Sequence, residues 1–217
     1  MASTQALGRG IDQTLLIIPT PRANLRSVPQ RVLVDANVLF SKTTMDWLFL
    51  LRMHNAGMFS LYATEDIIAE VLANMRKKNP TAPGHLTSHR AELIRNTLDE
   101  VLRDFPSDIP FTGADPADYH VHAAATNGRA DLLLTSNKPE DFTAHPDGEA
   151  YSIICPDEFF LLISKSNPSC LMPIIKEQMD YWSNKQEHLQ LDDALMGAQC
   201  PEFSLRVREE LQKLAFL

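Results

Sequence analysis

The chain has 217 residues, with 20 lysines and arginines against 28 aspartates and glutamates, and a formal net charge of −8. It is 44% hydrophobic and 22% charged, a composition typical of globular proteins that excludes a wholly disordered chain. The apolar runs are shorter than the ~18–20 residues of a membrane span, and the first residues lack the basic stretch and long apolar run expected of a secretory signal. Three widely spaced cysteines suit neither a disulfide framework nor a zinc site. We expect a cytoplasmic protein.

The N-terminal part of the chain predicts an extension followed by a strand, a helix and a second strand. Residues 1–30 hold three prolines and one short apolar run, so we expect this extension to be partly ordered. The first predicted strand is the β-branched run at 31–35. A helix is predicted over 44–56, where apolar residues recur on a helical period. A second strand follows at 58–64.

Capping signals mark the starts of the next helices. Thr64 is a predicted N-cap, followed by two acids in the first helical turn. Another helix is predicted at about 86–104. Asp115, followed by a proline, predicts the start of a further helix that stops at Gly128.

The remaining elements predict the fold class and the division of the chain into domains. Strands are predicted at 131–135 and 151–155, with a helix opening at Pro156. Strands and helices alternate, which favours an α/β fold with a parallel sheet and helices on both faces. From about residue 168 onward only helical periodicity is present. We therefore expect an extension (1–30), a central α/β domain (31–166) and a C-terminal helical extension (167–217).

Three acids are candidate site residues, and each also has a plainer interpretation. Ligands of a doubly wound sheet bind at the carboxyl ends of its strands, and Asp35 ends the first strand, where turn-forming aspartates also occur. Glu70 lies inside the helix after the second strand, where a surface glutamate is common. Asp118 lies in the first turn of its helix, where an acid stabilises the helix dipole by ~0.3–1 kcal/mol.

Together the three acids are more informative than each alone. If their carboxylates converge ~5 Å apart at one edge of the sheet, each pair repels by roughly 3 kcal/mol at an effective dielectric of ~20. Mg²⁺ and Mn²⁺ prefer carboxylate oxygens and would offset this repulsion. The expected chemistry is attack of a metal-activated water on a phosphodiester. His120 and His122 point to different helix faces, lack the spacing of a zinc helix and are interpreted as packing or surface residues.

Four segments stand in the order and spacing of a known family: "RVLVDANVLFS", "ATEDIIAEV", "DPADYHVHAAATNGRADLLLTSN", and "EDF" followed by "CPDEFFLLI". They resemble the PIN-domain ribonucleases, including the VapC-type toxins of bacterial toxin–antitoxin pairs. The resemblance covers roughly residues 31–163, and the helical tail is similar to that of one branch of these proteins. It implies a three-layer α/β/α sandwich with a central parallel sheet.

The resemblance also implies an activity, a cofactor and partners. It implies a Mg²⁺- or Mn²⁺-dependent endoribonuclease that cleaves RNA and is inhibited by a cognate antitoxin, and it is compatible with a homodimer. Asp35 and Asp118 would be the principal metal ligands, and Glu70 would complete the acidic cluster.

Three further residues would support that site. Asn37 would support the turn after the first strand. The family often has a fourth acid after the strand at 131–135, where this chain has Asn137, with Asp141 four residues on. Asn137 and Asp141 are therefore the candidates for a second metal position.

Alternatives remain open at this point. A catalytically weak PIN domain that binds RNA or acts as a scaffold fits Asn137 but does not explain the three acids. An aspartyl-phosphate hydrolase of the haloacid dehalogenase type would need a second aspartate where Asn37 stands. A flavodoxin-like receiver or binding domain has no need for acids at both Glu70 and Asp118.

Overall fold

A computed structural model describes residues 29–183 and 190–215 of the chain. Within these residues, five parallel strands form one sheet: β1 (Gln30–Val34), β2 (Phe59–Thr64), β3 (Glu100–Leu102), β4 (Leu132–Leu134) and β5 (Ser152–Ile154). Their order is β3-β2-β1-β4-β5, so the chain starts in the middle of the sheet and builds outward in both directions. The centre of β1 is fully buried, as expected of a parallel strand covered on both faces.

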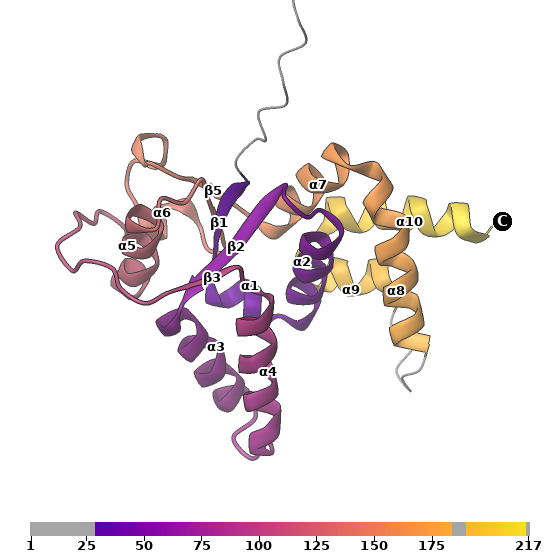
Figure 1. Cartoon of the computed structure of the whole chain (residues 1–217), viewed down its shortest axis with the longest axis horizontal. Coiled ribbons are helices and arrows are strands. Elements are labelled where there is room, and N and C mark those ends of the chain that lie inside the picture. Colours follow the sequence, from indigo (N-terminus) through magenta and orange to yellow (C-terminus); the bar gives the residue numbers. More distant parts are fainter. Residues whose placement is uncertain (1–28, 184–189, 216–217) are drawn as a thin grey trace, which may run out of the picture.

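Helices cover both faces of the sheet. In Figure 1 the sheet runs between α5 (Tyr119–Asn127) and α6 (Pro139–Phe142) on one side and α2 (Lys42–His54) and α7 (Pro156–Ser166) on the other. This arrangement confirms the predicted α/β/α sandwich with a central parallel sheet. The other helices of the described residues are α1 (Ala36–Phe40), α3 (Glu65–Lys78), α4 (Gly84–Thr97), α8 (Leu171–Ser183), α9 (Leu191–Gly197) and α10 (Pro201–Ala215).

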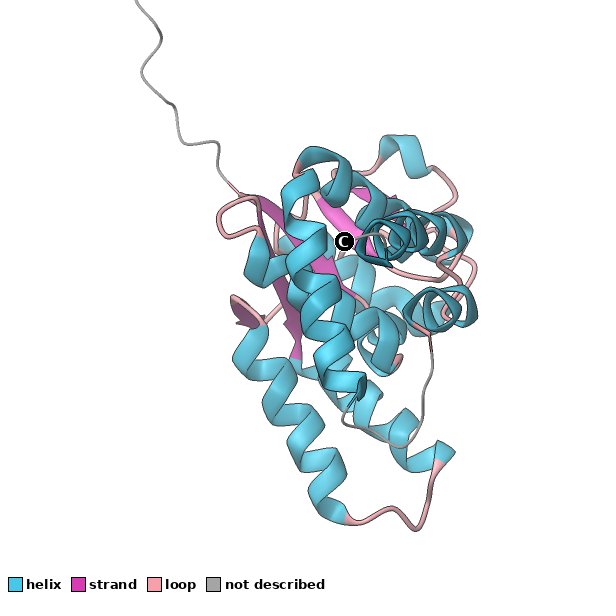
Figure 2. Cartoon of the chain, turned by 90° about the vertical axis from the view of Figure 1, so that its right-hand side faces the viewer, coloured by secondary structure: helices cyan, strands magenta, loops and turns pink. Residues whose placement is uncertain are grey.

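Helices α3 and α4 form a hairpin that projects below the carboxyl edge of the sheet, as Figures 1 and 2 show from two sides. The predicted cap is present at its start, because the Thr64 hydroxyl oxygen accepts a hydrogen bond from the amide of Ile67 at 3.1 Å. Three basic residues end α3, where they complement the helix dipole. The hairpin is therefore anchored at the sheet edge where predicted site residues lie.

The helix predicted at about 86–104 is present, but the predicted end of that helix was wrong. Helix α4 ends at Thr97, and β3 follows it. Asp99 sets this break, because its carboxylate accepts hydrogen bonds from the Leu61 amide and from Arg52, both at 2.8 Å. These contacts fix the chain against the edge of β2, and a helical pattern in the sequence contains no sign of them.

Two further differences concern short elements and the start of the chain. Helices α1 and α6 were not predicted, because four or five residues are too few to show a helical period. The expectation of a partly ordered extension falls on residues 1–28, which lie outside the described residues. No helix in the described part of the chain is both long enough and apolar enough to cross a membrane.

The C-terminal helices pack on the same hydrophobic core as the sheet. The ring of Phe203, in α10, lies edge-on to Trp47 at 5.1 Å between centroids and against Phe160 at 5.3 Å. The buried Asp157 carboxylate accepts hydrogen bonds from the backbone amides of Phe203 at 2.7 Å and Glu202 at 3.2 Å. Asp157 thus caps the start of a helix that is distant in sequence.

Replacing Asp157 with alanine is therefore expected to lower the free energy of unfolding by ~1–3 kcal/mol, because two amides of α10 lose their acceptor. Urea denaturation measures this loss. The matched control is Glu158→Ala, which removes an exposed acid from the same helical turn. Equal losses in the two variants would contradict the capping role of Asp157.

Candidate active site

The carboxyl ends of β1 and β4 bring predicted site residues together. The register pairs Val34 with Leu134, so the next residues, Asp35 and Thr135, lie side by side at the sheet edge. The Asp35 amide continues the pairing by donating to the Leu134 carbonyl at 3.0 Å. This edge is where doubly wound sheets bind their ligands.

Asp35 is 3% exposed, and its carboxylate is held by three donors. One oxygen, Oδ1, accepts from the Ala36 amide at 2.6 Å. The other, Oδ2, accepts from the Asn37 side-chain amide and from the Thr135 hydroxyl, both at 2.7 Å. Burial raises the pKa of Asp35 above its ordinary value, although the bonds from Thr135 and Ala36 oppose this change. The carboxylate is therefore fixed in orientation and costly to keep charged.

Two asparagines connect Asp35 to Asp118. The Asn37 Nδ2 group, which donates to Asp35, also donates to Asn137 Oδ1 at 3.1 Å. Asn137 Nδ2 in turn donates to Asp118 Oδ2 at 3.0 Å. Asn137 therefore lies at the same sheet edge as Asp35.

Asp118 ends a short 3₁₀ turn (Pro116–Asp118) and is half-buried. Its pKa is raised to about 6, first by burial and then by the negative charge of Asp35; the hydrogen bond from Asn137 opposes this rise. Asp35 and Asp118 therefore repel each other through space while two amides bridge them. This is the electrostatic arrangement expected of a pair of carboxylates that share a cation.

Glu70 approaches the same edge from α3. Its Oε2 atom lies 3.7 Å from the Nε2 atom of His120 on α5, an ion-pair distance when the imidazole is protonated. Interaction with Glu70 raises the pKa of His120, and the charge of Glu70 also raises the pKa of Asp35. Glu70 is thus coupled to the site by charge, and it is more exposed than Asp35.

Asp141 is not part of the hydrogen-bonded array. It lies in α6, where its Oδ2 atom accepts from the amide of Lys138 at 3.1 Å. Among the described residues its carboxylate makes no hydrogen bond to Asp35 or Asp118, and its charge is only one of the smaller causes of the raised pKa of Asp118.

Two residues of this site were not singled out from the sequence. Thr135 is fully buried and bonds both Asp35 and the Asn137 amide, and the Thr-x-Asn ending of its strand is the signal that marks it. His120 was interpreted as packing or surface, but it faces Glu70, and its Nδ1 atom is buried without a partner in residues 29–183 and 190–215. His122 does pack, between Tyr151 and the carbonyl of Pro110.

The oxygen atoms at this site fit a hard divalent cation that is also bound by water and by substrate. In the described residues no three His, Cys, Asp or Glu side chains lie close enough to hold a metal by themselves. Asp35 and Asp118 nevertheless supply two carboxylates beside an amide oxygen of Asn137. Mg²⁺ is commonly bound by one or two carboxylates plus water and substrate phosphate, so two carboxylates are sufficient.

Comparison with known proteins gives one match. A family model described as PIN domain matches residues 31–139, which are half of the 217-residue chain. The match includes Asp35, Glu70, Asp118 and Asn137 and ends before Asp141. No curated protein and no solved structure matches the chain.

Proposed function

The chain belongs to the PIN-domain family, and PIN domains are generally metal-dependent nucleases. We therefore propose that this protein is a Mg²⁺- or Mn²⁺-dependent endoribonuclease. The observation that carries the proposal is the hydrogen-bonded array from Asp35 through Asn37 and Asn137 to Asp118. It holds two repelling carboxylates at a sheet edge. No stability argument explains that arrangement, whereas a cation between the carboxylates would.

Each residue of the array has a distinct role in this proposal. Asp35 and Asp118 hold the metal, with Glu70 completing the acidic cluster. Asn37 and Asn137 orient the two carboxylates, and Thr135 fixes Asp35 from the neighbouring strand. A bound divalent ion would supply Lewis-acid chemistry and lower the pKa of water. In the hydrolysis that this chemistry supports, the water oxygen would bond to phosphorus and the bond to the leaving ribose oxygen would break, with a proton lost by the water and a proton gained by the leaving oxygen.

We further propose that the protein is the toxin of a toxin–antitoxin pair, with a PIN-like domain over 31–166 and a helical extension over 167–217. The support is the likeness of its motifs and helical tail to VapC-type toxins. Co-expression with the reading frame immediately upstream, followed by co-purification, tests the antitoxin. Harmless expression of the chain alone, with no partner recovered, would point to a housekeeping nuclease.

The test of the activity is cleavage of total RNA by the full chain with Mg²⁺, with Mn²⁺, and with EDTA. We expect cleavage with either metal and none with EDTA. Binding of intact RNA without cleavage in any metal would favour the catalytically weak domain that binds RNA or acts as a scaffold. Cleavage that persists in EDTA would contradict the metal-dependent proposal.

Asn137→Asp is expected to tighten metal binding by ~10-fold or more, since it adds a charged oxygen where the amide now bridges Asn37 and Asp118. Without metal, the variant should melt below the parent because three carboxylates then face one another. Mn²⁺ titration followed by calorimetry measures the affinity. The control Asn96→Asp adds the same charge on the exposed face of α4 and should leave the affinity unchanged. An unchanged affinity in Asn137→Asp would remove residue 137 from the metal site.

A further inference from the structure

A pocket of about 620 Å³ lies between the end of α1, the end of α3 and the start of α4. We call it the hairpin pocket; its wall includes Phe40, Lys42, Met75, Lys78, Leu86 and Arg90. No acidic residue lines it among the described residues, although acids outnumber bases in the chain by 28 to 20. The hairpin pocket is thus a cationic site on an acidic protein.

Two of the three cations that line the hairpin pocket, Lys78 and Arg90, are available to a ligand. Arg90 is half-buried and donates to the carbonyl oxygens of Leu39 at 2.9 Å and Phe40 at 3.3 Å, which fixes its guanidinium at the end of α1. No carboxylate of the described residues is within ion-pair distance of Arg90 or Lys78, whereas Lys42 is paired with Asp46. Burial lowers the pKa of Arg90, and the charge of Asp46 opposes this only in part, so an anion in the pocket would offset the remaining cost of burying the cation.

Apolar side chains lie beside these cations. Phe40, Met75 and Leu86 form an apolar wall, and Leu86 is 46% exposed. The Lys78 ammonium lies 5.7 Å from the centre of the Phe40 ring. A nucleotide has these same two parts, since its base stacks on aromatic and apolar groups while its phosphate pairs with cations. The volume also lies in the roughly 300–1,000 Å³ range of ligand pockets.

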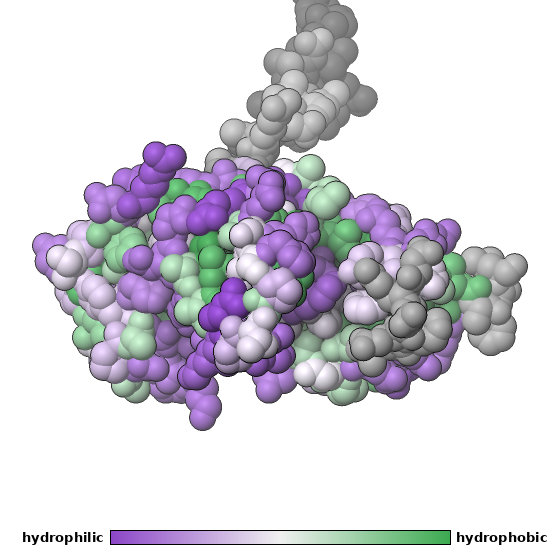
Figure 3. All heavy atoms as spheres, turned by 90° about the horizontal axis from the view of Figure 1, so that it is seen from below, coloured by the Kyte–Doolittle hydropathy of each residue, from purple (hydrophilic) through white to green (hydrophobic). Residues whose placement is uncertain are grey.

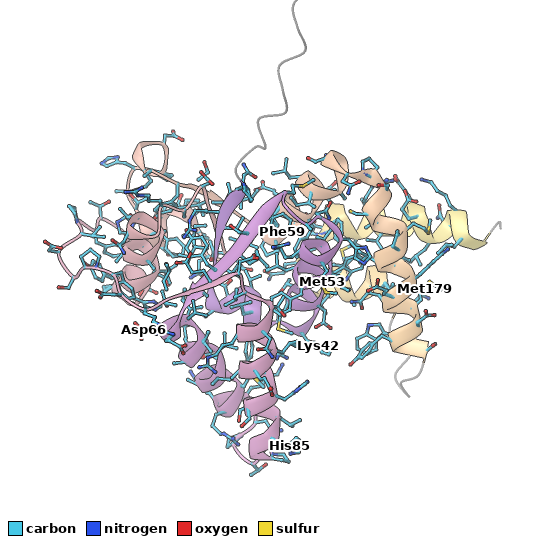
Figure 4. All side chains as sticks on the ribbon, viewed as in Figure 1. Lys42, Met53, Phe59, Asp66, His85 and Met179 are labelled. Atoms are coloured by element: carbon cyan, nitrogen blue, oxygen red, sulfur yellow. The ribbon has the colours of Figure 1, made fainter. Side chains whose placement is uncertain are left out.

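The hairpin pocket lies within reach of the acidic site. Helix α1 starts directly after Asp35 and ends at Phe40, a length of about 8 Å. Figure 4 shows Asp66 at the sheet end of the hairpin, His85 at its far end, and Lys42 beside it. Seen from below, hydrophilic and hydrophobic residues lie side by side on the face from which the hairpin projects (Figure 3). Nucleotides of a strand are spaced by roughly 3.4 Å or more, so a short stretch spans the distance.

We propose that the hairpin pocket binds a nucleotide of single-stranded RNA that flanks the cleaved bond. The phosphate pairs with Lys78 and Arg90, and the base lies against Phe40, Met75 and Leu86. This inference rests on the proposed ribonuclease function and adds a substrate subsite to it. The absence of acids among the described wall residues favours a polyanion over a protein partner of mixed charge.

The test is binding of a fluorescent single-stranded oligoribonucleotide, measured by anisotropy in Mg²⁺ with Asp118→Asn as a background expected to cleave it at least ~100-fold more slowly. In this background Lys78→Glu is expected to weaken binding by ~10-fold or more and to reduce the salt slope by about 0.7–1. The matched control is Lys77→Glu, which makes the same charge change at an exposed neighbour outside the hairpin pocket. Its loss should be less than ~3-fold.

A second pair of variants tests the base contact without any change of charge. Leu86→Ala should weaken binding by roughly 3-fold at an unchanged salt slope, because apolar contact with the base is lost. Leu205→Ala removes a leucine of the same exposure from α10 and should have no effect. Intact RNA is confirmed on a gel after each titration.

The outcomes separate the hairpin pocket from the ribonuclease proposal. Equal losses for Lys77→Glu and Lys78→Glu, or normal binding by Lys78→Glu, would overturn the hairpin pocket even if the parent chain cleaves RNA. RNA binding that depends on Lys78 in a chain that cleaves nothing would support the pocket and contradict the nuclease. If Lys78→Glu abolishes binding of a protein partner but leaves the affinity for RNA unchanged, the assignment of a nucleotide to the hairpin pocket would also be overturned.

Discussion

Replacing Asp35 with asparagine is expected to reduce RNA cleavage by about 10³-fold or more, below detection in an ordinary assay. The substitution keeps the shape of the side chain but removes a charged ligand of the proposed metal. A metal ion contributes several kcal/mol to a phosphodiester transition state, and each 1.36 kcal/mol is about tenfold in rate. Initial rates at saturating Mn²⁺ measure the effect.

The Asp35 variant should still fold, which makes its loss of activity interpretable. Asparagine cannot accept from all three donors, so the Thr135 hydroxyl or the Asn37 amide loses an acceptor at a cost of roughly 1–3 kcal/mol. Removing a carboxylate whose burial raises its pKa offsets part of that cost. A melting temperature close to that of the parent checks this expectation.

Asp141→Asn is the matched control for Asp35→Asn, because it makes the same change in an acid that caps its own helix. We expect it to reduce cleavage less than ~10-fold, with a modest weakening of the metal dependence. If Asp141→Asn is as damaging as Asp35→Asn, then Asp141 turns toward the metal in the active protein. The assignment of Asp35 and Asp118 as the principal ligands would then be incomplete.

Local patterns in the sequence predicted the parts of the fold that local interactions determine. The apolar run before Asp35 predicted a buried strand, and Thr64 predicted a helix start, because burial and capping depend on a few adjacent residues. The alternation of strands and helices predicted the parallel sheet, since parallel strands need helical crossovers. Because Asp35 follows the first strand of that sheet, its position at the carboxyl edge could also be predicted.

The features of the fold and of the site that could not be predicted from the sequence depend on contacts between residues that are distant in the sequence. The end of α4 depends on the bonds of Asp99 to Arg52 and Leu61, which come from other elements. The position of His120 beside Glu70 depends on how α5 packs against α3. The hairpin pocket likewise needs the ends of α1, α3 and α4 to meet. In each case at least one of the neighbours, such as α1 at the hairpin pocket, is separated from the others by dozens of residues in the sequence.

Replacing Asp118 with asparagine is expected to reduce cleavage by at least ~100-fold while raising the melting temperature in EDTA. The pKa of Asp118 is about 6 in the folded protein against 3.8 for a free aspartate, so folding favours its protonated form. At pH 7.5 the group is ionised beside Asp35, and asparagine relieves that repulsion while keeping an oxygen that accepts from Asn137. At this chain length roughly 2–4 °C of melting temperature corresponds to 1 kcal/mol.

The pH dependence of stability follows from the same pKa. The stability that Asp118 contributes is fully present below about pH 4, where the group is protonated in both states, and is lost as the pH rises through about 6. In EDTA the melting temperatures of parent and variant should therefore differ most at pH 7–8 and converge near pH 4. Differential scanning calorimetry across this range measures the convergence.

Metal should reverse the order of the two proteins. An ion that binds only the folded state stabilises it more as the ratio of the ion concentration to Kd increases. Because Asp118→Asn should bind Mn²⁺ more weakly, Mn²⁺ should raise the melting temperature of the parent more than that of the variant. Asp115→Asn is the control, since asparagine caps the turn as well as aspartate and Asp115 makes no bond to Asn137. Its metal response should match the parent's. A lower melting temperature of Asp118→Asn in EDTA, with the parent's response to Mn²⁺, would mean that Asp118 only stabilises the start of its helix.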